Sequence, residues 1–306
     1  MLALVAAPDK EEKVELREVP EPDPRPDELL AEVDSISLNR GEVNRLATAA
    51  DGWRPGWDVA GVVLEPARDG SGPPKGARVV GLSNFGGWGE RLAIPTRQVA
   101  VIPDPVSFAV AAALPIAGVT ALRLLRFGGL LLERRVLITG ASGGVGRIAI
   151  QLARQAGAVV TGVVGSAERG AGLDKLGADE VVVGIENASG EFHLILDAAG
   201  GSSLAHSLKL VADHGTVVAY GNSAREQTTF LVNDFYLKDA RLIGFFIMGD
   251  MRPHPVGEDL AGLLALVASG RLDPQLALEA SWRDAASALR ALRERKVAGK
   301  AVLHLD

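Results

Sequence analysis

Short apolar stretches dominate the first hundred residues. They predict strands at residues 2–6, 29–36, 58–64, 78–82 and 90–95, separated by turns rich in proline and glycine. Two segments, 20–26 and 65–76, concentrate proline, glycine and serine and are typical of exposed connections within one domain. The pattern therefore predicts a β-rich domain at the start of the chain.

From about Ser107 the pattern changes to a long Ala/Leu stretch that favours helix, and strands then alternate with helices. The expected strands are 136–139, 158–164, 180–183, 192–197, 216–220 and 241–247, with helices at 145–156, 167–176 and 202–210. This alternation predicts an α/β protein with a Rossmann doubly wound parallel sheet.

The last fifty residues no longer need the parallel sheet. A helix at 256–269 is followed by a strand at 276–280, a helix at 283–293 and a strand at 301–305. We expect the chain to return there to its first domain. The expected division is a β-rich catalytic domain at 1–112 and 273–306, and a dinucleotide-binding domain at 113–272.

Composition excludes several functional classes. The chain of 306 residues carries a net charge of −6, so nucleic acid is not an expected partner. It contains no Cys, which excludes disulfides, thiolate metal ligands and a catalytic thiol. None of the five His pairs with another at helical ligand spacing, and we expect no metal.

No membrane association is expected either. The longest apolar run, 108–122, is interrupted by Pro115 and is shorter than the roughly 18 residues that a membrane span requires. The first ten residues lack the pattern of a secretory signal. These observations favour a cytoplasmic protein.

The most informative motif is a glycine-rich turn between an apolar strand and an apolar helix. In such a turn, Gly143 and Gly144 let the backbone approach a pyrophosphate, Gly146 lets the helix pack closely on the strand, and the helix N-terminus offers free N–H groups. The residues expected to bind a dinucleotide here are Ala141, Ser142, Gly143, Gly144, Val145 and Gly146. The alternative is a glycine turn without a ligand.

The end of the following strand indicates which dinucleotide is preferred. An NAD enzyme places an acid there against the ribose 2′-hydroxyl, whereas this chain has Gly165 and Ser166. Ser166 and Arg169 can donate to a 2′-phosphate, which favours NADPH over NADH. Arg169 can alternatively be a solvated residue at a helix start, and the neighbouring Glu168 weakens the preference.

The order of several motifs along the chain resembles the medium-chain dehydrogenase/reductase superfamily, in its zinc-independent quinone oxidoreductase branch. The motifs are 37–42 (SLNRGE), 55–63 (PGWDVAGVV), 86–90 (GGWGE), 111–122 (AAALPIAGVTAL), 140–146 (GASGGVG), 197–201 (DAAGG) and 299–303 (GKAVL). The resemblance covers nearly the whole chain. It implies a partly open, barrel-like (GroES-like) catalytic domain beside a Rossmann domain, with nicotinamide in the cleft between them, and a homodimer.

The chain departs from the zinc-dependent members of that superfamily. Those enzymes use a Cys ligand and a Gly-His-Glu motif, whereas this chain has Gly56-Trp57-Asp58 at the matching position and no Cys. A catalytic zinc site of that form is therefore excluded.

The resemblance also implies roles for individual residues. Asn39 matches a cleft asparagine that binds the substrate carbonyl or the nicotinamide ribose, or else it is a turn-forming residue. Thr120 matches a threonine near the nicotinamide, or it bonds back to its own helix. Gly221, Asn222 and Ser223 follow a parallel strand at its carboxyl end, where ligands bind, or they form a plain turn.

Aromatic residues offer further contacts. Phe245 and Phe246 can border the nicotinamide, or they belong to the core or to a dimer-forming edge. Trp53 and Trp57 can line a pocket for an aromatic substrate, or they are buried anchors. Residues 39–48 contain no tyrosine to serve as a proton donor.

The sequence thus indicates an NADPH-dependent oxidoreductase that transfers hydride to a quinone or α,β-unsaturated carbonyl compound without a metal. One alternative is a non-catalytic NADPH-binding sensor or structural protein. Another is an enoyl-thioester reductase, although no basic cluster for a carrier phosphate accompanies the cleft motifs.

Overall fold

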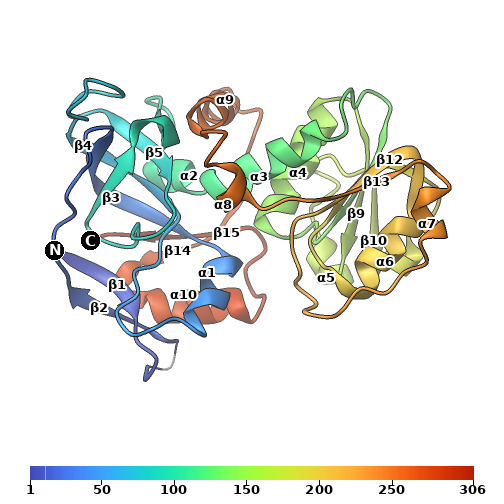
Figure 1. The fold of residues 1–306 in the computed structure, drawn as a ribbon, viewed down its shortest axis with the longest axis horizontal. Helices are drawn as coiled ribbons and strands as arrows, with labels where there is room; N and C mark the ends of the chain where they lie inside the picture. The colour runs from blue at the N-terminus through green and yellow to red at the C-terminus, as the bar shows by residue number, and fades with distance from the viewer. Residues whose placement is uncertain (11) are drawn as a thin grey trace. The chain divides into compact units, whose positions relative to one another are not determined.

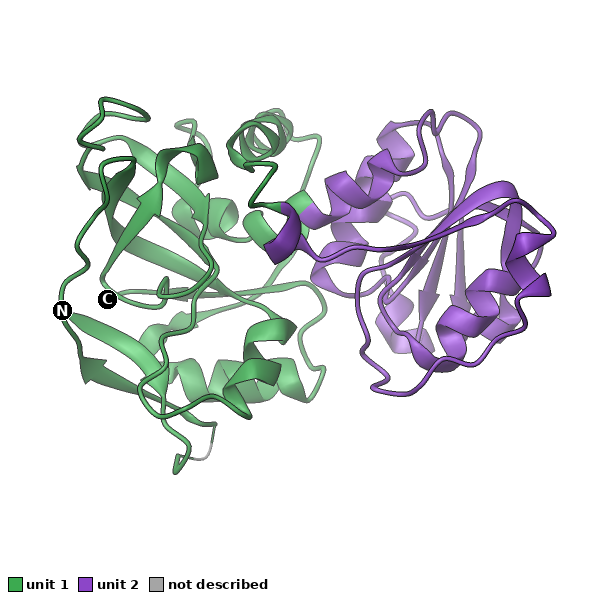
Figure 2. Ribbon diagram, in the orientation of Figure 1, with its two compact units in different colours: residues 1–119, 251–306 green, residues 120–250 purple. Residues whose placement is uncertain are grey.

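The computed structural model describes residues 1–10 and 12–306. The chain forms two compact units, Met1–Val119 with Met251–Asp306 (unit 1) and Thr120–Asp250 (unit 2) (Figure 2). The C-terminal segment belongs to the same unit as the N-terminal segment. The return comes at Met251, earlier than the expected residue 273, because the helix at Gly257–Ala268 packs against strands of unit 1.

Among the described residues of unit 1, seven strands form a mixed sheet of order β14-β15-β3-β4-β5-β7, with β6 paired to β3 (Figure 1). These strands are β3 (Glu28–Leu38), β4 (Asp58–Glu65), β5 (Arg78–Leu82), β6 (Arg91–Pro95), β7 (Val99–Val101), β14 (Leu276–Ser281) and β15 (Lys300–His304). A separate antiparallel pair joins β1 (Leu2–Ala6) to β2 (Val14–Glu18). The strands β2 and β7 were not expected from the sequence.

The helices of unit 1 lie around this sheet. They are α1 (Arg40–Leu46), α2 (Phe108–Ala112), the start of α3 (Pro115–Arg126), α9 (Gly257–Ala268) and α10 (Ala285–Arg293), with 3₁₀ turns at Thr96–Gln98 and Trp282–Asp284. The expected single helix after Ser107 is two helices, because Pro115 lacks an N–H group and disfavours helical backbone in the residue before it. Pro115 then serves as the first residue of α3.

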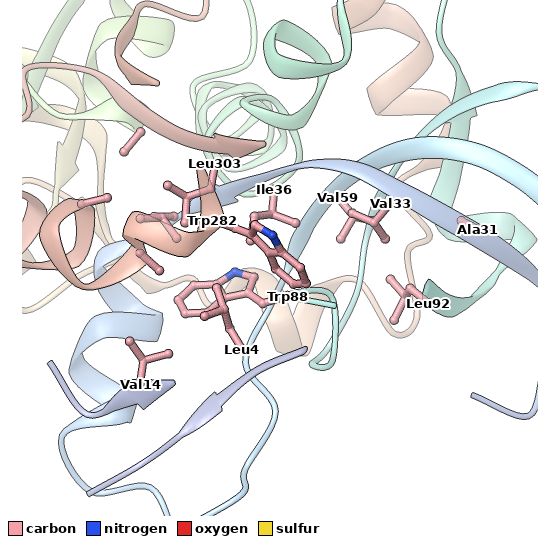
Figure 3. Close-up of a cluster of buried hydrophobic side chains, with 14 of the residues drawn as sticks. Leu4, Val14, Ala31, Val33, Ile36, Val59, Trp88, Leu92, Trp282 and Leu303 are labelled. Carbon is pink, nitrogen blue, oxygen red and sulfur yellow. The ribbon is translucent and has the colours of Figure 1, made fainter. Parts of the chain in front are cut away.

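The core of unit 1 joins segments from both ends of the chain. Trp88 and Trp282 are fully buried and pack with Leu4, Ile36 and Leu303 (Figure 3). Two tryptophans contribute large apolar areas, so this contact between the N-terminal and C-terminal segments is a main source of stability in the unit.

Unit 2, residues 120–250, is described throughout and contains a six-stranded, fully parallel sheet of order β10-β9-β8-β11-β12-β13. The strands are β8 (Arg135–Thr139), β9 (Val159–Val164), β10 (Glu180–Val183), β11 (Phe192–Asp197), β12 (Val211–Ala219) and β13 (Arg241–Gly244). Numbered within the unit, the order is 3-2-1-4-5-6. This is the expected Rossmann topology.

Four helices connect these strands: α4 (Gly144–Gln155), α5 (Ala167–Gly170), α6 (Gly201–Leu210) and α7 (Asn233–Tyr236), with a 3₁₀ turn at Ile185–Asn187. The remainder of α3 precedes β8, and α8 (Ile247–Asp250) follows β13. The helix expected at 167–176 ends at Gly170, where Ala171 is extended and Gly172 has a φ of +77°. The strand expected at 241–247 ends at Gly244, because the chain turns into α8.

Candidate functional site

The glycine-rich turn joins β8 to α4, at the place in the sheet where the strand order reverses. A Cβ atom on Gly146 would lie 2.6 Å from Ala141 Cα and 2.7 Å from Gly140 O, so only glycine permits this close approach of helix and strand. Gly143 precedes α4 with extended backbone, and Gly140 has a φ of +63°. This is the backbone geometry in which helix N–H groups face an anionic ligand.

The carboxyl end of β9 lies next to this turn in the sheet. Gly165 is exposed, and a Cβ atom there would meet nothing within 4 Å. Ser166 precedes α5, and a hydrogen bond from its side chain lowers the pKa of Glu168. Arg169 lies in the same turn. The segment thus combines two donors with one carboxylate, and a phosphate would have to compete with Glu168 for Ser166.

Arg147 is a candidate that the sequence interpretation missed. Its side chain is buried, and its guanidinium donates to Ser142 O at 3.2 Å and to Ala171 O at 3.5 Å. It therefore links the glycine-rich turn to the segment that follows α5. The sequence feature that could have identified Arg147 is its position in the first turn of a helix whose other early residues are apolar or glycine.

The carboxyl ends of β11 and β12 lie farther along the same edge of the sheet. Buried Asp197 accepts hydrogen bonds from Gly200 N (2.7 Å) and Ser203 Oγ (2.8 Å), which fixes the start of α6. A Cβ atom on Gly221 would lie 2.7 Å from Ala198 O, and Ser223 N donates to the same oxygen at 3.2 Å. Gly221, Asn222 and Ser223 are exposed at this edge, in a turn that Asn222 closes by accepting from Arg225 N.

Thr120 does not bond back to its own helix. Its side chain is 4% exposed, and among the described residues its Oγ1 has no hydrogen-bond partner. A buried hydroxyl without a partner is costly, and such groups are often completed by a ligand.

The two phenylalanines of the predicted cofactor site have different environments. Phe245 is buried, and its ring lies edge-on to Phe127 with centroids 6.0 Å apart. Phe246 is 70% exposed. Phe245 therefore belongs to the core of unit 2, whereas only Phe246 presents a ring to its surroundings.

In unit 1, Asn39 lies in a buried polar network with three ionisable side chains. Its Nδ2 donates to Asp58 Oδ2 at 2.9 Å and to Glu42 Oε2 at 3.1 Å, and its Oδ1 accepts from Lys300 Nζ at 2.9 Å. Lys300 also reaches Asp58 Oδ2 at 3.2 Å. All four side chains are at most 9% exposed.

This network favours the structural interpretation of Asn39 over the expected role as a donor to substrate. Both amide hydrogens are engaged, so donation to a developing oxyanion would require the network to open. The backbone N–H of Asn39 also donates to Glu42 Oε2 at 2.9 Å, which fixes the start of α1. The structure thus shows a helix-starting residue with a charged environment.

The two carboxylates of the network hold neighbouring segments. Asp58 Oδ1 accepts from Ile116 N at 2.8 Å, in the first turn of α3, and Glu42 Oε1 accepts from Trp57 N at 2.8 Å. Burial, together with the charge of Asp58, raises the pKa of Glu42 to about 8. Burial also raises the pKa of Asp58, against the opposing effect of Lys300.

The predicted pocket tryptophans lie on the same stretch of chain. Trp53 packs against the core of unit 1, and Arg45 lies 4.8 Å above its ring. The Trp57 ring covers Gly41, where a Cβ atom would lie 2.6 Å from Trp57 Cη2. Trp53 therefore anchors its segment to the core of unit 1, and the Trp57 ring is held in place by its contact with Gly41 of α1.

Comparisons with known proteins indicate the family to which this chain belongs. Residues 144–269 match the family model described as "Zinc-binding dehydrogenase". The chain is 33% identical over 290 residues to the spectinabilin polyketide synthase system protein NorB of Streptomyces orinoci, covering 91% of this chain and 13% of that much longer protein. It is 31% identical over 280 residues to the chloroplastic quinone-oxidoreductase QR1 of Triphysaria versicolor, covering 83% of each chain.

The chain belongs to the medium-chain dehydrogenase/reductase superfamily. Within it, this chain falls in the zinc-independent quinone oxidoreductase-like branch, as its motifs predicted. Its fold matches that of the Escherichia coli quinone oxidoreductase complexed with NADPH, with a TM-score of 0.87 at 23% identity, covering 100% of each chain. The expected fold class is thereby confirmed for this medium-chain oxidoreductase.

The described part of this medium-chain oxidoreductase contains no helix that is both long and apolar enough to cross a membrane. Within the same residues, no three His, Asp or Glu side chains are arranged to hold a metal ion.

Proposed function

We propose that this chain is an NADPH-dependent reductase that transfers hydride to a quinone or an α,β-unsaturated carbonyl compound without a metal. The observation that carries the proposal is the glycine-rich turn at the strand-order reversal of the parallel sheet, where Gly146 brings α4 against β8. Open α/β sheets bind dinucleotides at this point.

The residues present fit a nicotinamide dinucleotide. The backbone of residues 141–146 and the start of α4 would bind the pyrophosphate, and Ser166 with Arg169 would bind the 2′-phosphate. The Thr120 hydroxyl, which has no hydrogen-bond partner among the described residues, is available to a ligand. When bound, the reduced nicotinamide supplies the hydride.

The remaining work of the chain is to position the two reactants and to hold the catalytic unit rigid. Trp57 occupies the motif position at which the zinc-dependent relatives carry a histidine, and its ring is packed against Gly41. The buried network of Asn39, Glu42, Asp58 and Lys300 fixes the backbone at Trp57, because Trp57 N donates to Glu42 Oε1. Substrate activation then rests on hydrogen bonding in place of a Lewis acid.

Assembly and location form part of the proposal. β13 is an edge strand, and exposed apolar side chains accompany it at Leu231, Val232, Leu237 and Leu242. An open strand edge with apolar neighbours favours pairing with a second copy. We therefore propose a homodimer, and the absence of cysteine fits a reducing cytoplasm.

The decisive experiment has two stages. Calorimetry with NADPH and NADH first tests for binding, and NADPH oxidation is then followed at 340 nm with quinones, enones and an enoyl-CoA. Binding followed by turnover of a quinone or enone supports the proposal. Binding of NADPH without turnover of any acceptor would indicate a sensor, and turnover of the enoyl-CoA alone would indicate a thioester reductase.

A further inference from the structure

Arg54 carries a charge that no acidic side chain among the described residues neutralises. Among the described residues its guanidinium forms no ion pair, and its one hydrogen bond, from NH2 to Gly86 O, is long at 3.4 Å. Its Nε is buried and has no hydrogen-bond partner. Burial lowers the pKa of Arg54 from its ordinary value, as expected for a cation without a compensating anion.

The acids on the same stretch of chain are committed elsewhere. Asp51 binds Arg17 through both carboxylate oxygens, Glu42 accepts from Asn39 and Trp57, and Asp58 accepts from Asn39, Lys300 and Ile116. None of the three neutralises Arg54. Retaining a half-buried, unneutralised guanidinium is unfavourable, and such positions are often ligand sites.

The backbone that carries Arg54 is rigid. Gly86 N donates to Arg54 O at 3.1 Å, Gly87 N donates to Gly56 O at 3.1 Å, and Trp88 N donates to Pro55 O at 3.2 Å. These bonds join residues 54–56 to residues 86–88. A guanidinium on a fixed backbone loses less freedom when it binds a planar anion in a bidentate manner.

Two aromatic residues are close in sequence to Arg54 and to its hydrogen-bond partner. Trp57 follows Arg54 by three residues, and Phe85, which precedes Gly86, is 63% exposed. We propose that Arg54 binds an anionic group of the substrate, a carboxylate attached to the α,β-unsaturated carbonyl skeleton. This inference rests on the proposed function and narrows its substrate class from any quinone or enone to acidic ones.

The test compares 4-oxopent-2-enoate with its methyl ester, which removes the charge and keeps the skeleton. In each reduction hydride adds to one alkene carbon from NADPH and a proton adds to the other. The ratio of kcat/KM for acid and ester is measured in the wild type, Arg54→Met, Arg54→Lys and the control Arg25→Met, whose side chain is exposed. Dividing the ratios cancels both differences in folding and the intrinsic reactivity of the ester.

We expect Arg54→Met to lower the acid-to-ester ratio by about ten- to a hundredfold, the effect of one charge-assisted hydrogen bond. Arg54→Lys should retain part of the preference, and Arg25→Met all of it. An unchanged ratio in Arg54→Met overturns the proposal. So does a loss seen only for but-2-enoyl-CoA relative to its N-acetylcysteamine thioester, because that result would assign Arg54 to a carrier phosphate.

A binding measurement separates this inference from the proposed function. The saturated product, 4-oxopentanoate, is titrated while tryptophan fluorescence is followed, which requires no turnover. Binding to the wild type that weakens at least tenfold in Arg54→Met supports the anion site even if no acceptor is reduced. Equal affinity for both proteins overturns the site even if quinones are reduced.

Discussion

Asn39 illustrates what a local motif determines about a single residue. The sequence placed it shortly after a predicted strand, and in the structure it directly follows β3, which ends at Leu38. Its partners Asp58 and Lys300 are 19 and 261 residues away, and Lys300 reaches it only because β15 pairs with β3. Nothing in the spacing of residues 37–42 reveals that pairing, so the buried charges around Asn39 could not be predicted.

The network predicts how Asn39→Leu behaves. The substitution leaves Lys300 and Asp58 each without one buried partner, and an unsatisfied buried group costs about 1 to 3 kcal/mol. We expect the melting temperature to fall by at least about 3 °C, while turnover per folded molecule stays within roughly threefold of the wild type. Asn233→Leu, at an exposed position, is the control. A large fall in kcat at an unchanged melting temperature would restore the predicted role as a donor to substrate.

A second prediction at this scale concerns cofactor choice. Arg169→Ala should weaken NADPH binding by about ten- to a hundredfold and leave NADH binding nearly unchanged, because one charge-assisted bond to the 2′-phosphate is removed. Calorimetry with both cofactors measures this directly, and Arg252→Ala, at an exposed arginine, is the control. Equal losses for NADPH and NADH would show that Arg169 does not recognise the 2′-phosphate.

At the scale of elements, apolar runs bounded by turn residues predicted the strands, whereas short helices with few apolar residues were not predicted correctly. The strands at 78–82, 180–183 and 192–197 have the expected bounds, since each is an apolar run ended by turn residues. The helix α1 was missed because its seven residues present few apolar positions, and its start depends on the Asn39–Glu42 bond. The predicted helix at 167–176 is longer than the observed α5, because the glycine backbone conformations that end the helix are not specified by residue type alone.

The position of Glu42 on α1 predicts a pH dependence of stability. Its pKa is raised from the ordinary value of 4.5 to about 8, so the folded state binds this proton more tightly than the unfolded state does. The resulting stabilisation is complete below about pH 4.5 and is lost as the pH rises towards 8. The loss is on the order of a few kcal/mol, since each unit of pKa corresponds to about 1.4 kcal/mol.

Urea unfolding between pH 5 and pH 9 tests this dependence. Glu42→Gln should flatten the decline in unfolding free energy across this window, although the variant is less stable at every pH because an amide NH₂ replaces one acceptor oxygen. Glu65→Gln, at an exposed position, should keep the wild-type slope. An unaltered slope in Glu42→Gln would place the titrating group elsewhere, with Asp58 as the next residue to vary.

At the scale of the whole molecule, the order of motifs carried the prediction of the fold. The alternation after residue 135 was sufficient for the parallel sheet, and the change of pattern after residue 256 predicted the return of the C-terminal segment, in agreement with the family resemblance. The exact return point could not be read from the pattern, because α9 is apolar enough to pack against either unit. Its contacts with β7 and β5 assign it to unit 1.

The edge strand β13 leads to a prediction about assembly. Sedimentation equilibrium of the wild type should give a mass near twice the 31.9 kDa of the chain. Leu242→Lys, which places a charge on the open edge, should shift the protein towards the monomer, because charged side chains block pairing between strand edges. Val101→Lys, on the exposed face of β7 in unit 1, is the matched control. A monomeric wild type would refute the homodimer.

The last prediction is that activity survives chelation. A zinc site of the kind found in related dehydrogenases requires a thiolate and an imidazole, but this chain has no Cys and carries Trp57 at the position of the imidazole. The carboxylates that would lie nearest, Glu42 and Asp58, are already held by Asn39, Trp57 and Lys300. Dialysis against EDTA should therefore leave kcat within about 20% of its starting value, and added zinc should not raise it. The control is a zinc-dependent alcohol dehydrogenase dialysed in parallel, which must lose its activity. Collapse of the rate and its recovery with zinc would show that the proposed metal-free hydride transfer is wrong.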